Sequence, residues 1–271
     1  EGFWEEVLKA GWPFALMGIL GGIYLYMDRV LLSVMRGDTV VGWYSAGAKV
    51  FWTIYAVQAF FYKALFPTAS KTYKESPDHC RRLLERTGRL ISTYTIPVAV
   101  AGIIWAPQVV AFLYGRDYIP AVPALQILLL NIVIKGWTAL YGGMILNVVG
   151  RQREFMYAVA LGALVNVVLD ILLIPSISLK GAAIATVCAE GVVCTFAFLR
   201  ARRVLEVHVA RYLWKPTLAS GAMASLWLFE KGAFWICFGI GTFLVVLWLL
   251  GGIRLQDIGF ISTSLRIRRV G

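Results

Sequence analysis

"EFMYAVALGALVNVVLDILLIP", residues 154–175, decides the fold class. After Glu154 this stretch carries a single charged residue, Asp170, and it is long enough for the ~20 residues that a helix needs to cross a bilayer core. The turn-like segments "GRQRE" and "PSISLKG" flank it. We therefore interpret residues 154–175 as a membrane-spanning helix.

The same pattern recurs along the chain. Apolar residues make up 59% of it and charged residues 15%, with a mean hydropathy of +0.74, whereas ordinary soluble domains are roughly 25% charged. A nucleic-acid-binding protein can be this basic but is not this apolar. The sequence thus predicts an all-α fold, a polytopic transmembrane helix bundle of about eight spans, at roughly 9–35, 40–66, 90–114, 121–149, 154–175, 180–201, 211–229 and 233–251.

Basic residues, which give a net charge of +11, are distributed unequally between alternate loops. Those near 71–89, 151–153, 200–215 and 254–269 are rich in Lys and Arg, whereas the opposite loops hold only Arg36, Arg116, Lys180 and Lys231. Because Lys and Arg are retained on the cytoplasmic side, we expect the basic loops, and both ends of this chain, to be cytoplasmic.

The longest basic loop is predicted to contain its own amphipathic helix, at about 77–90. Ser76 is a suitable N-cap, Pro77 suits the first helical position, and Asp78 suits the positive end of a helix. Arg and Leu residues then alternate on its faces. We expect a solvated helix at an anionic lipid surface, or a collar that gathers anionic headgroups near an entry portal.

Lysines inside the predicted spans are candidates for a cavity. Lys135 lies near the middle of its span, between Asn131 and Thr138 on one polar stripe, and no neighbour in its own helix neutralises it. Charged groups at this depth usually face a water-filled cavity or a partner. Lys49 is also deep in its span, whereas Lys63 is close enough to an end to extend to the interface.

Acidic residues inside the spans are Asp28, Asp170 and Glu190. Asp28 and Arg29 are about 100° apart around a helix, so we expect Arg29 to face the cavity and Asp28 a basic or amide partner on a neighbouring helix. The alternative places both, and also Asp170, at the outer interface. Glu190 lies on a small-residue face and is either a neutral packing residue or a site for an ion or proton.

Reaction chemistry is not indicated by the sequence. Its four cysteines, Cys80, Cys188, Cys194 and Cys237, form no CxxC motif, so we expect structural cysteines and neither a metal site nor a cofactor. The first residue is Glu1 in a context typical of the middle of a protein, and we expect a fragment that lacks an N-terminal part.

Several stretches in order give a family resemblance. They are "YMDRVLL", "VVGWYSAGAKV", "KALFPTASK", "LYGRDYIPAVPALQILL" and "LNVVGRQREFMYAVALGALVNVVLDILLIPSISLKGAAIATVCAE". Together they resemble the polysaccharide-biosynthesis flippases of the multidrug/oligosaccharidyl-lipid/polysaccharide flippase superfamily. The resemblance implies a complete protein of two six-helix lobes in an inverted V. Residues 1–202 would then be the C-terminal lobe, residues 203–271 two further spans and a basic tail, and the N-terminal lobe a missing partner.

The resemblance also implies a function. Such a flippase moves a polyisoprenyl-diphosphate-linked oligosaccharide from the inner to the outer leaflet of a prokaryotic plasma membrane by alternating access, and it is not an enzyme. On this interpretation Arg29, Lys49, Asn131 and Lys135 bind the lipid-linked glycan substrate, and Asp28, Asp170 and Glu190 are candidates for coupling to H⁺ or Na⁺. The alternative is a cation-coupled multidrug exporter of the same superfamily, which would require acidic rather than basic charges in its cavity.

Overall fold

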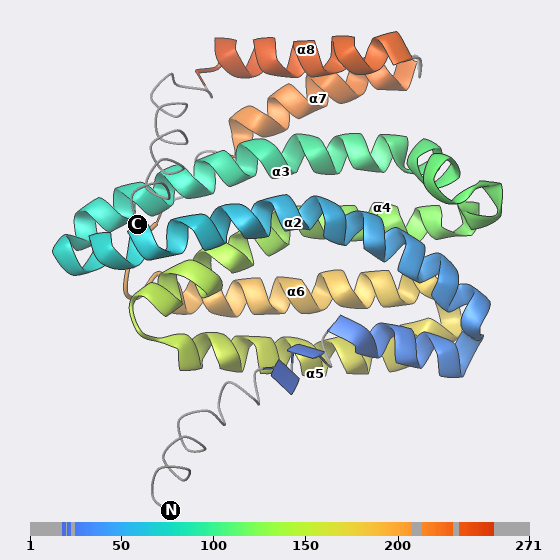
Figure 1. The fold of residues 1–271 in the computed structure, drawn as a ribbon, viewed down its shortest axis with the longest axis horizontal. Helices are drawn as coiled ribbons and strands as arrows, with labels where there is room; N and C mark the ends of the chain where they lie inside the picture. Colours follow the sequence, from blue (N-terminus) through green and yellow to red (C-terminus); the bar gives the residue numbers. More distant parts are fainter. Residues whose placement is uncertain (1–17, 20, 23–24, 208–212, 230–232, 252–271) are drawn as a thin grey trace, which may run out of the picture.

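The computed structural model describes the chain except residues 1–17, 20, 23–24, 208–212, 230–232 and 252–271. Every regular element in the described ranges is helical, as the composition predicts (Figure 1). Residues 18–19 and 21–22 are helical, and a continuous helical stretch over residues 25–36 comes next. It is followed by α2 (Asp38–Glu75), α3 (Pro77–Tyr114), η1 (Arg116–Ala121), α4 (Val122–Thr138), η2 (Ala139–Leu146), α5 (Gln152–Ile177), α6 (Leu179–Ala201), α7 (Trp214–Phe229) and α8 (Ala233–Leu249).

Successive helices run antiparallel, so their connections gather at two ends of the bundle. The α2–α3 turn and the loop before α5 lie at one end, at the left of Figure 1, and the α3–η1 and α5–α6 turns lie at the other. Gly115 ends α3 with φ +86° and donates its N–H to the carbonyl oxygen of Ala111. A side chain is strained at this φ, so the glycine allows the abrupt reversal into η1.

Within the described residues, four helical segments are long and apolar enough to cross a membrane: Pro77–Tyr114, Arg116–Leu146, Gln152–Ile177 and Leu179–Ala201. They coincide with four of the predicted spans. Much of the predicted span 9–35, and the basic tail around residues 254–269, lie outside the described residues. The crossing of the membrane by α2, α7 and α8 remains a prediction.

The amphipathic segment 77–90 is not a separate helix. Its start is as predicted, because the Ser76 hydroxyl accepts the N–H of His79 (3.3 Å) and Pro77 occupies the first turn. Helix α3 then continues without a break to Tyr114. Most added residues complete one more backbone hydrogen bond, the exceptions being Pro97 and Pro107, which have no N–H. Ending the helix near Arg89 would leave carbonyl groups without partners. Buried Cys80 and Leu84 anchor the segment against Leu65 and Ala69 of α2.

Helix α6 lies between α4 and α5, and small residues allow this close packing. Ala182, Ala185 and Ala189 are fully buried on it. A Cβ on Gly181 would lie 2.7 Å from the backbone of Leu173 in α5. Small residues of this kind let membrane helices approach closely, and the approach brings the polar residues of α6 within reach of both neighbours.

The stretch 25–36 is tied to the far end of α5. The Arg36 guanidinium donates to the carbonyl oxygen of Ile174 (3.2 Å) and to that of Pro175. Free carbonyl groups at a helix C-terminus attract a cation in this way. The contact sets residues 25–36 alongside α5 and α6, where Asp28 meets Asp170.

Helices α7 and α8 form a hairpin beside α3, at the edge of the bundle (Figure 1). Trp227 of α7 meets Trp105 of α3 edge to face, with ring centroids 5.9 Å apart. The proposed boundary near residue 202 agrees with this arrangement but remains a prediction.

Candidate functional site

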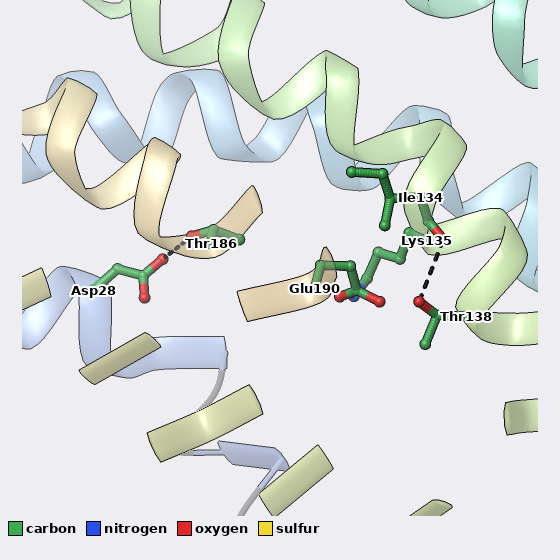
Figure 2. Close-up of polar contacts among 6 residues, drawn as sticks. All are labelled: Asp28, Ile134, Lys135, Thr138, Thr186 and Glu190. Atoms are coloured by element: carbon green, nitrogen blue, oxygen red, sulfur yellow. Dashed lines mark hydrogen bonds and ion pairs between the residues drawn. The ribbon is translucent and has the colours of Figure 1, made fainter. Parts of the chain in front are cut away.

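Two polar residues one turn apart on α6 organise the candidate site. Thr186 and Glu190 are separated by four residues and therefore lie on one face of the helix. Figure 2 shows Thr186 reaching Asp28 of the 25–36 stretch, and Glu190 reaching Lys135 of α4. The site therefore consists of two charged clusters along the same side of α6.

The first of these, which we name the acidic cluster, consists of Asp28, Asp170, Tyr44 and Thr186. The Asp28 side chain is buried, and its Oδ2 accepts the Tyr44 hydroxyl at 2.6 Å and the Thr186 hydroxyl at 2.9 Å. The sequence had indicated a basic or amide partner for Asp28, or an outer-interface position. The structure corrects both expectations, because the partners are hydroxyl groups in the bundle interior.

Asp170 makes the acidic cluster rich in oxygen atoms. Its carboxyl group is within hydrogen-bonding reach of the Asp28 carboxyl group. It is fully buried rather than at an interface, and neither of its oxygens accepts a bond from the described residues. The Thr186 hydroxyl also lies 2.9 Å from the Ala182 carbonyl oxygen, although its one proton can serve only one acceptor. Two buried carboxyl groups in contact require a proton or a cation between them.

The second cluster, which we name the Lys135 pair, consists of Lys135 and Glu190. The Lys135 Nζ donates to the Glu190 Oε2 at 2.6 Å, and the side chains are 13% and 2% exposed. The rings of Trp52 and Tyr55 lie 5.4 and 5.6 Å from the ammonium group, within cation–π range. Glu190 is therefore neither a lone packing residue nor an isolated ion site, since it neutralises Lys135.

Two adjoining cavities border these clusters. The smaller one, of ≈ 20 Å³, is lined by Leu25, Asp28, Arg29, Tyr44, Ala48, Phe51, Trp52, Leu128, Asn131, Lys135 and Thr186. The larger one, of ≈ 340 Å³, is lined by Gly21, Leu25, Trp52, Tyr55, Lys135, Thr138, Ala139, Gly143, Phe155, Val159, Glu190 and Val193. Leu25, Trp52 and Lys135 line both. A cavity of ~10–15 Å³ on this scale holds one water. The smaller cavity therefore fits a single small ion, and the larger cavity fits a group of several atoms, such as a lipid headgroup.

Three of the predicted substrate-binding residues border these cavities and one does not. Arg29 lines the smaller cavity, with its guanidinium 5.4 Å from the Tyr26 ring. Asn131 is fully buried there, and neither its amide nitrogen nor its oxygen has a hydrogen-bond partner among the described residues. Lys49 instead lies on an exposed face of α2 and lines neither cavity. It is about 100° around the helix from Ala48, which faces the smaller cavity.

Several site residues were missed in the sequence. Tyr44, Trp52 and Tyr55 project from one face of α2 toward the two clusters. Their helical spacing was visible, but an aromatic stripe in a membrane helix is usually a packing face. The π-helical segment η2 directly follows Thr138, which lines the larger cavity. Such widened turns are frequent at functional sites and have no sequence signature of their own.

Known proteins give an independent line of comparison. A family described as polysaccharide biosynthesis protein matches residues 3–123. An uncharacterised membrane protein of Methanocaldococcus jannaschii is 26% identical over 207 residues, which are 74% of this chain and 40% of that protein. A Shigella flexneri protein named for O-antigen transport is 27% identical over 110 residues, 40% of this chain and 25% of that protein. The chain thus spans less than half the length of these relatives.

Solved structures share the fold. Lipid II flippase MurJ in an inward closed conformation has a TM-score of 0.77, with 16% identity over 94% of this chain and 55% of that chain. An outward-facing multidrug resistance MATE family transporter of the MOP superfamily has a TM-score of 0.62, with 16% identity over 80% of this chain and 52% of that chain. At this identity the two comparisons show that the chain shares the fold of these transporters. The match to residues 3–123 covers less than half of the chain, and it agrees with the family resemblance of the sequence.

Proposed function

We propose that this chain is one lobe of a flippase that moves a polyisoprenyl-diphosphate-linked oligosaccharide from the inner to the outer leaflet by alternating access, for cell-surface polysaccharide biosynthesis. The observation that carries the proposal is Lys135, a partly buried ammonium group at the boundary of two cavities, bordered by Trp52 and Tyr55. No enzymatic step is part of the proposal, and the relatives whose names state a role are transporters or flippases.

The chemistry of Lys135 favours an anionic headgroup. At an effective dielectric constant near 20, one cation ~4 Å from one phosphate charge gains about 4 kcal/mol before desolvation. The flanking aromatic rings suit the apolar faces of sugar rings as well as the cation. An interior-negative membrane potential further favours outward movement of an anion, by about 2.3 kcal/mol per charge per 100 mV. Arg29 and Asn131 would complete this side of the site.

The acidic cluster is the better candidate for the coupling ion. Carboxyl, hydroxyl and carbonyl oxygens from Asp28, Asp170, Thr186 and Ala182 converge next to a cavity that fits one small ion. Oxygen ligands suit a hard monovalent cation such as Na⁺, and one shared proton would satisfy the same pair of carboxyl groups. We therefore assign coupling to Asp28 and Asp170 rather than to Glu190.

The rival function, a cation-coupled multidrug exporter, draws on the same acidic cluster and on the likeness to the MATE transporter. An organic cation requires an uncompensated acidic group in a large cavity. The acidic cluster borders only the smaller cavity, whereas the acid that lines the larger one, Glu190, is neutralised by Lys135. The distribution of cavity volume and charge therefore favours the flippase.

The test is transport by the complete protein in vesicles. A fluorescent short-chain prenyl-diphosphate sugar, incorporated in both leaflets, should become accessible to an external quencher faster with protein than without it. Lys135→Gln should abolish this gain, whereas Lys63→Gln, an exposed residue of α2, should retain it. If the vesicles instead export ethidium and do not flip the diphosphate lipid, the exporter function replaces this proposal.

The orientation also remains to be tested. We propose that both ends of this chain are cytoplasmic, because the connections rich in Lys and Arg gather at one end of the bundle. In a cysteine-free background, an impermeant maleimide added outside cells should label Arg116→Cys and not Arg151→Cys. The opposite labelling pattern would reverse the topology.

A further inference from the structure

We propose that Glu190 acts as the resting counter-ion of Lys135 and takes up one proton from water when an anionic phosphate group binds at Lys135. This inference rests on the proposed function, because it assumes that Lys135 holds the anion. It adds a link between substrate binding and pH that is separate from the coupling ion at the acidic cluster.

The geometry of the Lys135 pair leads to this exchange. One side of the ammonium group is bonded to the Glu190 carboxylate at 2.6 Å, and the rings of Trp52 and Tyr55 border it. The two side chains form a neutral unit in a buried position. A phosphate group that approaches Lys135 through the larger cavity would bring a second anion next to Glu190, and burial makes that repulsion strong.

Protonation relieves the repulsion without moving a helix. A neutral Glu190 carboxyl group can donate to a phosphate oxygen, and Lys135 then has the phosphate as its charge partner. Both side chains line the ≈ 340 Å³ cavity, so the proton and the phosphate have a common route to them. The proton comes from solvent in the cavity and returns to it when the phosphate group leaves.

The other described groups that face Glu190 do not replace Lys135 as its partner. From α2, Tyr55 faces it, and on α6 itself Cys194 does; both are neutral at neutral pH. From α4 the cavity wall adds Thr138, and from α5 it adds Phe155 and Val159. Among these groups Lys135 alone carries a positive charge, so a phosphate group and Glu190 compete for the same cation.

The consequence is a pH dependence of definite sign. The bound state holds one more proton than the free state, so binding tightens as pH falls, by up to about tenfold per pH unit where Glu190 is ionised before binding. Glu190→Gln represents the protonated state. Its binding should be tight at all pH values, apart from the titration of the ligand itself.

The experiment measures binding of farnesyl diphosphate to the complete protein in nanodiscs by titration calorimetry. Dissociation constants are compared at pH 6 and pH 8 for the wild type, Glu190→Gln and the control Glu154→Gln, whose carboxyl group pairs with Arg151 and Arg200 at the opposite end of α5 from Asp170. The ratio of wild type to Glu190→Gln cancels the titration of the diphosphate. We expect the wild type to lose at least about tenfold more affinity than Glu190→Gln between these pH values, and Glu154→Gln to follow the wild type.

A second readout is independent of any variant. In two buffers of different ionisation enthalpy at pH 7.5, the apparent binding enthalpy of the wild type should differ by the amount expected for uptake of about one proton beyond that of the ligand. Equal pH profiles for the wild type and Glu190→Gln, with no such uptake and with binding still lost in Lys135→Gln, would overturn this inference and leave the proposed function standing. Unchanged binding in Lys135→Gln would overturn both.

Discussion

The acidic cluster and the Lys135 pair lie one helical turn apart on α6, yet they solve the problem of buried charge in opposite ways. The Lys135 pair is internally neutral, with a carboxylate 2.6 Å from an ammonium group. The acidic cluster places two carboxyl groups together, and the side-chain donors to them among the described residues are hydroxyl groups. The charges of the Lys135 pair balance in the absence of any ligand, whereas the charges of the acidic cluster balance only with a bound proton or cation.

The presence or absence of a counter-charge indicates what each cluster can bind. A group that lacks a counter-charge attracts an ion of opposite sign, and the acidic cluster borders a cavity that fits one such ion. A group that already has its counter-charge must exchange it, and the Lys135 pair lines the larger cavity where a headgroup fits. The same physical rule, that buried charges require partners, therefore underlies both the proposed ion site and the proposed exchange site, which lie within one turn of helix.

Lys135→Met should give the largest effect, because it breaks the complete cluster. It leaves the Glu190 carboxylate buried without its cation, which costs about 3–5 kcal/mol of unfolding free energy. The double variant Lys135→Met/Glu190→Gln should recover most of that loss while remaining inactive in transport. Thermal unfolding in detergent measures both. Equal destabilisation of the single and double variants would contradict a neutral pair.

Thr186→Val tests the hydroxyl donors of the acidic cluster. Loss of the bond from Thr186 to the Asp28 carboxylate should lower the unfolding free energy by about 1.5–3 kcal/mol. Thr195→Val is the matched control on the same helix, since its hydroxyl is exposed and donates only to the Gly191 carbonyl oxygen (2.8 Å) among the described residues. Chemical unfolding of the two variants should separate them clearly, and similar values would mean that the Asp28 contact contributes little.

Asp170→Asn should act in the opposite direction to Lys135→Met. In a buffer without Na⁺ and at high pH, removing one of two adjacent buried carboxyl groups should stabilise the protein by about 1–3 kcal/mol, because the amide satisfies the neighbouring carboxylate. Unfolding temperatures with and without Na⁺ should differ for the wild type and coincide for Asp170→Asn. A wild type that is indifferent to both Na⁺ and pH would remove the distinction between the two clusters.

Lys49→Gln should have the smallest effect of these changes. Lys49 lies on the exposed face of α2, away from both cavities, so the unfolding temperature should not change measurably. Transport by the complete protein then decides whether Lys49 belongs to the binding residues, as the sequence predicts. A loss of transport with unchanged stability would place Lys49 in a cavity formed with the rest of the protein.

The sequence by itself determined the helices and several of their boundaries. Ser76 and Pro77 specify the start of α3, because capping depends on neighbours within one turn. Apolar runs bounded by "GRQRE" and "PSISLKG" specify α5 in the same local way. Charged residues inside such runs identified Lys135, Asp28, Asp170 and Glu190 as unusual, since a charge within an apolar span requires a partner or water in any fold.

The tertiary structure decided which of these residues meet. Lys135 and Glu190 are 55 positions apart, and Asp28 and Thr186 are 158 apart. Helical periodicity shows which residues share a face of one helix, but not which neighbour that face contacts. The choice follows from close packing of α6 against α4 and α5, made possible where Gly181 has no side chain and Ala182 has only a methyl group. Lys49 also depends on the tertiary structure. The sequence shows its position along the helix, but the packing of α2 determines that its side chain is exposed.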